Sequence, residues 1–144
     1  HSRYPSPLAI GIIDIDHFKE INTKYLHTGG DQVLKSFARI LSSTIREVDS
    51  IGRIGGEEFM VIARETALEG AEIIAERIRS HIERTPIYHG SHVIYVTVSI
   101  GFAVADVGLP TDIPTETAAA ALKEAKLSGR NRFEIRCLNQ NQVN

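Results

Sequence analysis

The stretch "SIGRIGGEEFMVIAR", residues 50–64, places two apolar segments on either side of Gly55 and Gly56. Apolar and β-branched residues around a Gly-Gly pair predict a β-hairpin with a type I′ turn, because that turn needs positive φ at both central positions. Glu57 and Glu58 are adjacent where the second strand begins, so their negative charges repel each other. The hairpin therefore predicts a cation or a set of donors nearby that compensates these two carboxylates.

Working outward from the hairpin, the sequence predicts an α+β order of strands and helices. The run "LAIGIIDI", residues 8–15, is apolar almost throughout, as expected of a central strand buried on both faces. Thr66 and Glu69 form a capping-box pattern ahead of apolar residues at helical spacing. In chain order the predicted elements are a strand at 8–15, helices at 17–25 and 30–48, hairpin strands at 50–54 and 57–63, a helix from residue 66, a strand at 92–105, a loop at 110–117, an alanine-rich helix ending at Gly129, and a strand at 132–136.

The composition indicates one soluble globular domain. The chain has 144 residues, of which 42% are hydrophobic and 24% charged, which is enough for a full core. Its net charge of -2 provides no broad basic surface, so we expect no nucleic acid partner. Cys137 is the single cysteine, which excludes an internal disulfide and a cysteine metal cluster. The run at 8–15 is too short to span a bilayer, and we expect a cytoplasmic domain without membrane contact of its own, whether or not the protein that carries it is attached to a membrane.

Two aspartates end the first predicted strand. Asp14 and Asp16 are two residues apart, so their side chains leave the same face of the sheet. Asp16 is explained equally well as the N-cap of the following helix. Asp14 needs a partner, because an ionised carboxylate at the end of an apolar strand is costly without compensation. If this strand lies beside the hairpin, Asp14 meets Glu57 and Glu58, and such carboxylates hold Mg²⁺.

The segment "RIGGEEF" resembles the signature of the GGDEF family of diguanylate cyclases, in a form with glutamate at the third position. Other family motifs follow in the same order and spacing: "DIDHFKEIN" at 14–22, "GD" at 30–31, "AERIR" at 75–79, "VTVSIG" at 96–101 and "AKLSGRNR" at 125–132. The resemblance implies one GGDEF domain over residues 1–144 without the family's opening segment. It also implies a ferredoxin-like palm fold, related to nucleotidyl cyclases, with a central antiparallel sheet flanked by helices.

The same resemblance implies the activity and the site. The family joins two GTP molecules into cyclic di-GMP and releases pyrophosphate, by two-metal phosphoryl transfer with Mg²⁺ or Mn²⁺ across a homodimer. The implied catalytic residues are Asp14, Glu57 and Glu58, and the implied metal ligands are Asp14, the carbonyl of Ile15, and Glu57. The implied GTP-binding residues are Asn22, Asp31 and Leu34 at guanine, and His17, Phe18, Lys19, Gly55, Gly56, Lys126 and Arg130 at the phosphates.

Several of these residues also have plain structural interpretations. Lys126 and Arg130 near the end of a helix complement its dipole, and Asn22 suits a solvent-exposed surface equally well. "REVD", residues 46–49, matches the family's inhibitory Arg-x-x-Asp site, which implies product binding at Arg46 and Asp49 with help from Arg77. A solvated pair at a helix end is the alternative for that motif.

The sequence also departs from the family pattern. Thr23 and Ala119 stand where aspartate is usual, Leu26 replaces a glycine, and Lys123 replaces a tyrosine. The alternative to a cyclase is a non-catalytic GGDEF receptor that binds cyclic di-GMP or GTP. In either case we expect a fused sensory or regulatory domain as a further partner.

Overall fold

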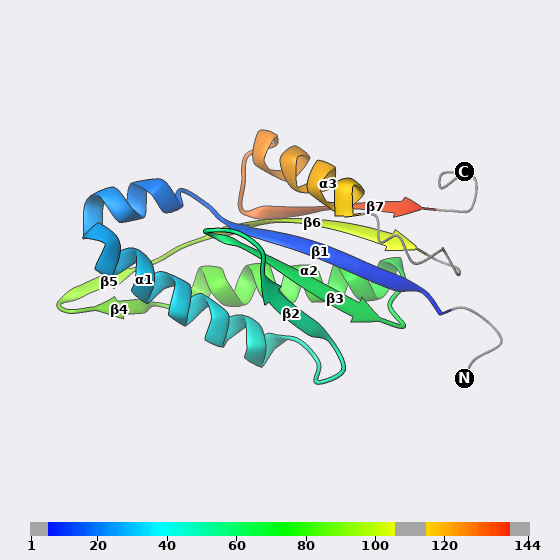
Figure 1. The fold of residues 1–144 in the computed structure, drawn as a ribbon, viewed down its shortest axis with the longest axis horizontal. Coiled ribbons are helices and arrows are strands. Elements are labelled where there is room, and N and C mark those ends of the chain that lie inside the picture. Colours follow the sequence, from blue (N-terminus) through cyan, green and yellow to red (C-terminus); the bar gives the residue numbers. More distant parts are fainter. Residues whose placement is uncertain (1–5, 106–114, 139–144) are drawn as a thin grey trace.

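The computed structural model describes residues 6–105 and 115–138. Figure 1 shows how the helices and strands of these residues are arranged. In chain order they are β1 (Leu8–Ile15), α1 (Phe18–Thr44), β2 (Ser50–Arg53), β3 (Glu58–Arg64), α2 (Leu68–Arg84), β4 (Ile87–His89), β5 (His92–Ile94), β6 (Val98–Ala105), α3 (Thr115–Leu127) and β7 (Arg132–Leu138).

The main sheet has five strands in the order β2-β3-β1-β6-β7. The central strand β1 pairs antiparallel with β3 and with β6, and β2 pairs antiparallel with β3. β7 joins β6 in parallel, because the chain crosses over through α3 before it returns to the sheet. The predicted α+β palm fold, with its antiparallel centre and flanking helices, is confirmed, and one parallel strand is added at its edge.

Helices cover both faces of this sheet, with α1 and α2 on one side and α3 on the other (Figure 1). Ile13 of β1 belongs to the larger core cluster, together with Phe37 of α1 and Ile78 of α2. Ile12 of the same strand packs with Leu122 of α3 in a second, smaller cluster. Alternate residues of β1 therefore serve two cores, which explains why the strand is apolar almost throughout.

The backbone of α3 lies directly against β6 at Gly101. A Cβ atom at this position would overlap the backbone of Ala118 and Leu122. Ala121 and Ala125 are also buried on this helix, so small residues allow the close approach. The result is that the C-terminal end of α3 is held beside the end of β1, where the predicted site lies.

The helices predicted at 17–25 and 30–48 form one bent helix, α1. The bend is at Leu26, which has φ 64° and ψ 179°. Only glycine adopts these backbone angles readily, so the backbone at Leu26 is strained. Leu26 is 69% exposed, and hydrophobic burial therefore does not offset this strain. The helix also ends earlier than predicted, because Ile45 has extended backbone angles.

The strand predicted at 92–105 is interrupted at residues 95–97. Its first part, β5, pairs with β4 in a separate two-stranded sheet that the sequence did not predict. At the interruption, the carbonyl of Thr97 accepts a hydrogen bond at 2.9 Å from the backbone N–H of Asp16, the residue that follows β1.

The turn of the 50–64 hairpin also differs from the prediction. Neither Gly55 nor Gly56 has the positive φ that a type I′ turn needs, and the connection comprises residues 54–57. The guanidinium of Arg53 donates to both glycine carbonyls, at 3.0 and 2.6 Å. This side chain stabilises a wider loop than a two-residue turn.

Of the loop predicted at 110–117, residues 110–114 lie outside the described ranges, and 115–117 open α3. None of the helices within the described ranges is long and apolar enough to cross a membrane.

Candidate active site

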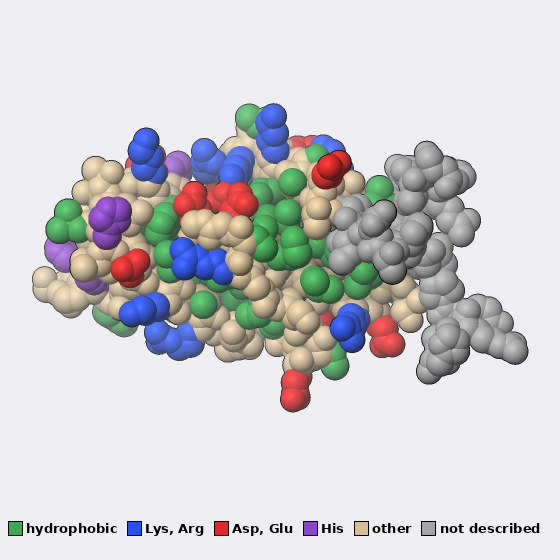
Figure 2. Space-filling view, in the orientation of Figure 1, with side chains coloured by type: hydrophobic (Ala, Val, Ile, Leu, Met, Phe, Trp, Pro, Cys, Tyr) green, Lys and Arg blue, Asp and Glu red, His purple; other side chains and the backbone are tan. Residues whose placement is uncertain are grey.

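The end of β1, the start of α1, the β2–β3 connection and the end of α3 enclose a cavity of about 180 Å³. In Figure 2, acidic side chains gather beside Lys and Arg side chains over this part of the molecule. The cavity is lined by Asp14, Ile15, Asp16, His17, Phe18, Lys19, Glu20, Glu57, Lys126 and Arg130. It thus brings together every residue predicted as a metal ligand and most of those predicted to bind phosphate.

Asp14 is buried at the end of β1, with 6% of its surface exposed. Its partner is Lys126 of α3, whose Nζ lies 2.5 Å from Asp14 Oδ2. The ammonium group compensates the buried carboxylate, as the position of Asp14 at the end of an apolar strand requires.

Glu58 lies opposite Asp14 in the antiparallel pairing of β1 and β3. Burial raises the pKa of Glu58, and a hydrogen bond with Asp14 and the charge of that carboxylate raise it further, while Lys126 acts in the opposite direction. Two carboxyl groups of the sheet and the ammonium group of α3 therefore lie next to each other.

The oxygen atoms available for a metal ion come from the end of β1 and from the β2–β3 connection. The described residues hold no group of three or more His, Cys, Asp or Glu side chains arranged for a metal. Asp14, Ile15 and Glu57 do border the same cavity, and the Ile15 N–H donates to the Glu57 carbonyl at 3.2 Å. This set of hard oxygen donors fits Mg²⁺ or Mn²⁺, which use few protein ligands when substrate phosphates supply others.

Asp16 is not the helix cap that the sequence suggested. The N-cap of α1 is His17, which has φ 56° and makes no side-chain capping bond. Asp16 is buried instead, and its carboxylate accepts hydrogen bonds from Thr97 and Ser99 hydroxyls at 2.6 Å and from the Asn131 N–H at 3.0 Å. It joins β1, β6 and the α3–β7 connection.

The start of α1 forms one wall of the cavity. His17, Phe18 and Lys19 line it, and the first N–H groups of a helix have no partner within the helix. Together with Lys126 and Arg130, which line the same cavity, they make an environment that suits phosphate groups.

The residues predicted to bind guanine lie on α1 and do not line this cavity. A Cβ atom at Gly30 would overlap Oδ1 of Asn22, so the Asn22 side chain lies against the backbone next to Asp31. Asp31 is exposed, and Leu34 is half-buried against the larger core. The bend at Leu26 thus lies between Asn22 and the other two predicted guanine residues, and the Asn22 side chain reaches Gly30 in the second helical segment.

The departures from the family pattern lie outside the cavity. Thr23 is exposed, and its hydroxyl donates to the Lys19 carbonyl at 3.0 Å. Ala119 and Lys123 are exposed on α3, and Leu26 is at the bend of α1.

Arg46 and Asp49, the predicted inhibitory pair, bind each other. The Arg46 guanidinium donates to both carboxylate oxygens, at 3.0 and 2.8 Å, and the Asp49 side chain is fully buried. Arg46 also donates to the hydroxyl of Thr66, and that hydroxyl donates to the Arg64 carbonyl. Thr66 is therefore not part of a capping box, and the N-cap of α2 is Ala67.

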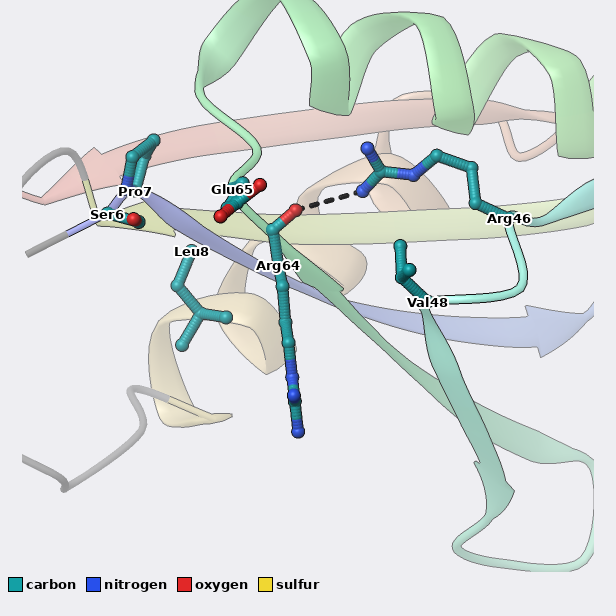
Figure 3. A pocket seen from close by; sticks show the side chains of 7 residues that line it. All are labelled: Ser6, Pro7, Leu8, Arg46, Val48, Arg64 and Glu65. Atoms are coloured by element: carbon teal, nitrogen blue, oxygen red, sulfur yellow. Dashed lines mark hydrogen bonds between the residues drawn. The ribbon is translucent and has the colours of Figure 1, made fainter. Parts of the chain in front are cut away.

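Arg46 and Arg77 line one cavity of about 390 Å³ between the end of α1 and the start of α2. Arg46 also borders a second cavity of about 520 Å³. Figure 3 shows this second cavity, where the Arg46 guanidinium reaches the end of β3 and donates to the Arg64 carbonyl at 2.9 Å. The structure thus places the three predicted inhibitory residues close together and away from the 180 Å³ cavity.

The polar residues that support the site were not predicted from the sequence. Asn131 contacts Asp16 through its backbone and α2 through its side chain. Thr97 and Ser99 complete the shell around Asp16. The one available signal was Asn131 after Gly129 and Arg130, since asparagine tolerates left-handed backbone angles at helix ends.

Comparison with known proteins shows the family to which this chain belongs. The family model "Diguanylate cyclase, GGDEF domain" matches residues 1–132. The chain is 44% identical over 128 residues to the response regulator PleD of Caulobacter vibrioides and 43% identical over 129 residues to diguanylate cyclase A of Treponema denticola. These matches cover 87% and 89% of this chain but only 28% and 35% of the two relatives.

A solved structure supports the same relationship. The active GGEEF domain of a diguanylate cyclase from Vibrio cholerae superposes with a TM-score of 0.78 at 33% identity, covering 90% of this chain and 83% of that one. The motifs, the sheet order and the family match agree over almost the whole chain. This chain belongs to the family of diguanylate cyclase GGDEF domains.

Proposed function

We propose that this domain is a diguanylate cyclase that condenses two GTP molecules into cyclic di-GMP and releases pyrophosphate. One observation carries the proposal: Asp14 and Glu57 border the same cavity as Lys126, Arg130 and the start of α1. Phosphoryl transfer depends mainly on positioning and charge neutralisation, and this cavity combines metal-binding oxygens with phosphate-binding donors. The names of the relatives support the same activity.

The residues of the cavity divide into three roles. Asp14, Glu57 and the Ile15 carbonyl hold Mg²⁺ or Mn²⁺, which when bound neutralises phosphate charge and makes the 3′-hydroxyl more acidic. The backbone N–H groups of Phe18 and Lys19 bind the triphosphate, with His17 at the same helix start. Lys126 and Arg130, which line the same cavity, reach the phosphates, and the open turn at Gly55 and Gly56 lets the nucleotide approach the backbone.

The remaining proposed roles are the recognition of guanine and the role of Glu58. Asn22 and Asp31 read guanine, since an amide pairs with its O6 or N7 and a carboxylate accepts from its N1–H and N2–H. Leu34, three residues after Asp31 on α1, is proposed to contact the same base. Glu58 lies beside Asp14 on the neighbouring strand and acts near the attacking 3′-hydroxyl.

The product requires two copies of the domain. Cyclic di-GMP contains two equivalent phosphodiester bonds, whereas one domain has one set of these residues. Two domains therefore face each other across a two-fold axis, each with its own GTP. Because the chain spans about a third or less of the curated relatives, other parts of a longer protein, including a sensory domain, are proposed to bring the two copies together.

Product binding at a separate site would regulate the reaction. Arg46, Asp49 and Arg77 lie close together next to a cavity of about 390 Å³, distant from the metal-binding residues. Arginine suits guanine and phosphate because its planar fork donates two parallel hydrogen bonds. We propose that cyclic di-GMP binds there and inhibits the enzyme.

The deciding experiment incubates the domain with GTP and Mg²⁺ and separates the products by chromatography. We expect cyclic di-GMP and pyrophosphate from the native chain and none from Asp14→Asn or Glu57→Ala, with circular dichroism unchanged. Glu47→Gln, at an exposed residue outside the cavity, is the control that retains activity. Binding of GTP or cyclic di-GMP without any turnover would replace this proposal with the non-catalytic receptor.

A further inference from the structure

We propose that Asn131 is a positioning residue that fixes Arg130 at the phosphate wall of the cavity by anchoring the α3–β7 connection to both β1 and α2. The inference rests on the proposed function, in which Arg130 binds phosphate. It assigns a role to a polar network around Asn131 that joins the end of β1 to α2.

The backbone around Arg130 has an unusual course. Gly129 and Arg130 close α3, with N–H groups that donate to the carbonyls of Lys126 and Ala125 at 3.4 and 3.0 Å. After Gly129 at φ 129°, Arg130 and Asn131 have φ 64° and 48°. Two successive residues with a Cβ atom are thus held in left-handed conformations, which need support from the surrounding structure.

The first anchor is a buried carboxylate. Asp16 is only 5% exposed and accepts the backbone N–H of Asn131 at 3.0 Å. The hydroxyls of Thr97 and Ser99 hold the same carboxylate at 2.6 Å. Asp16 therefore has a fixed orientation, and it fixes the backbone immediately after Arg130.

The second anchor is on α2. Asn131 Oδ1 accepts from Arg79 Nη1 at 3.0 Å, and Asn131 Nδ2 donates to Glu83 Oε2 at 2.6 Å. Arg79 is itself held by Glu76 at 2.8 and 2.7 Å and by Glu83 at 3.1 Å, with 19% of its side chain exposed. The amide of Asn131 thus uses its donor and its acceptor on two charged partners that also bind each other.

This arrangement has a direct consequence for the cavity. Arg130 lies between the close of α3 and the doubly anchored Asn131, and it lines the same cavity as Asp14 and Glu57. Because its backbone is fixed on both sides, less conformational entropy is lost when its guanidinium binds a phosphate. Asn131 is suited to this position because it tolerates the left-handed conformation and offers both a donor and an acceptor.

The test is a double-mutant cycle between Asn131→Gly and Arg130→Ala, with GTP affinity measured by calorimetry in the presence of Mg²⁺. Glycine keeps the left-handed backbone and the N–H bond to Asp16 but removes both contacts to α2. We expect Asn131→Gly to weaken GTP binding about tenfold, and to have no further effect once Arg130 is alanine. Arg136→Ala breaks an exposed pair with Glu124 and is the control that leaves GTP affinity unchanged. Independent, additive losses of affinity in the double mutant would overturn the positioning role.

A second measurement does not depend on the nucleotide. Trypsin cleavage after Arg130 in the folded protein, located by mass spectrometry, should be at least several-fold faster in Asn131→Gly and in Arg79→Ala than in the native chain. An unchanged cleavage rate in both variants would show that Asn131 does not anchor the connection. If the native chain binds no GTP, the proposed function fails, and the cleavage rates still decide whether Asn131 fixes Arg130.

Discussion

Lys126 Nζ lies 2.5 Å from Asp14 Oδ2, although the two residues are 112 positions apart in the chain. The side chain of Asp14 is 9% exposed and that of Lys126 is 33% exposed. This ion pair joins the end of α3 to the end of the central strand, and it compensates the buried carboxylate of a proposed metal ligand. The charge of the site and the attachment of α3 therefore depend on the same contact.

Replacing this lysine should make stability sensitive to metal. Lys126→Met keeps the length of the side chain but leaves Asp14 without its cation, so we expect a loss of about 1–3 kcal/mol in the free energy of unfolding. Mg²⁺ bound at Asp14 should restore part of this loss. Thermal unfolding with and without Mg²⁺ measures both effects.

The matched control for that prediction is Arg136→Met, which breaks an exposed ion pair between β7 and α3. Its effect should be small and independent of Mg²⁺, because exposed pairs contribute little. An equal Mg²⁺-dependent shift in the native chain, in Lys126→Met and in Arg136→Met would remove Asp14 from the metal site.

Gly101 should be sensitive to the smallest possible side chain. A methyl group there would overlap the backbone of α3 at Ala118 and Leu122, so Gly101→Ala should lower the free energy of unfolding by roughly 1–3 kcal/mol or more. It should also reduce turnover, because α3 carries Lys126. Gly52→Ala, where nothing lies within 4 Å of the added carbon, is the control for denaturant unfolding. Equal stability of both variants would contradict the packing described for α3.

Leu26 is expected to be a site where a smaller residue stabilises the protein. Its φ of 64° and ψ of 179° are readily adopted only by glycine, so Leu26→Gly should raise the free energy of unfolding by about 1 kcal/mol. Leu127 is similarly exposed, at 79%, but helical, and Leu127→Gly should destabilise by about the same amount. Opposite signs in chemical denaturation would confirm the strain, whereas a loss in both variants would refute it.

The sequence predicted the features that depend on neighbouring residues and those that belong to the family motifs. The apolar run of β1, the hairpin at residues 50–64 and the cavity residues from Asp14 to Lys19 were all within its reach. It could not predict contacts between distant segments: the partners of Asp16 at Thr97 and Asn131 are 81 and 115 residues away. For the same reason Asp16 was open to interpretation as a helix cap, because capping can be judged from neighbouring residues and a buried network cannot.

Local rules also failed where tertiary contacts override them. β-branched residues continue through 92–105, yet the strand is interrupted where Thr97 bonds to Asp16. The Gly-Gly pair favours a type I′ turn, yet the Arg53 side chain stabilises a wider loop by binding two turn carbonyls. The bend at Leu26 has no signal in its residue type, since leucine favours a regular helix.

Inhibition by cyclic di-GMP should depend on Arg77 without any loss of catalysis. Arg77→Ala leaves the Arg46–Asp49 pair intact, whereas Arg46→Ala also leaves the fully buried Asp49 carboxylate without its charged partner. We therefore expect both variants to relieve inhibition, and Arg46→Ala alone to lose stability. Initial rates against cyclic di-GMP concentration, together with thermal unfolding, separate the two effects. Unchanged inhibition in Arg77→Ala would exclude this residue from the regulatory site.

The dependence of the rate on protein concentration tests the assembly that the chemistry requires. Each domain contributes one set of residues around Asp14 and Glu57, and the two bonds of the product are equivalent, so two copies must meet with their GTP molecules antiparallel. Mass action then sets the active fraction, and below the dimer dissociation constant the total rate should rise roughly as the square of protein concentration. A dimeric parallel coiled coil fused to the N-terminus should raise the rate at low concentration, because it increases the effective concentration of the second domain. A coiled coil with charged residues in place of its apolar seam is the matched control and should give no increase. A strictly linear rate over a wide dilution series, with a monomer by light scattering throughout, would show that one domain acts alone.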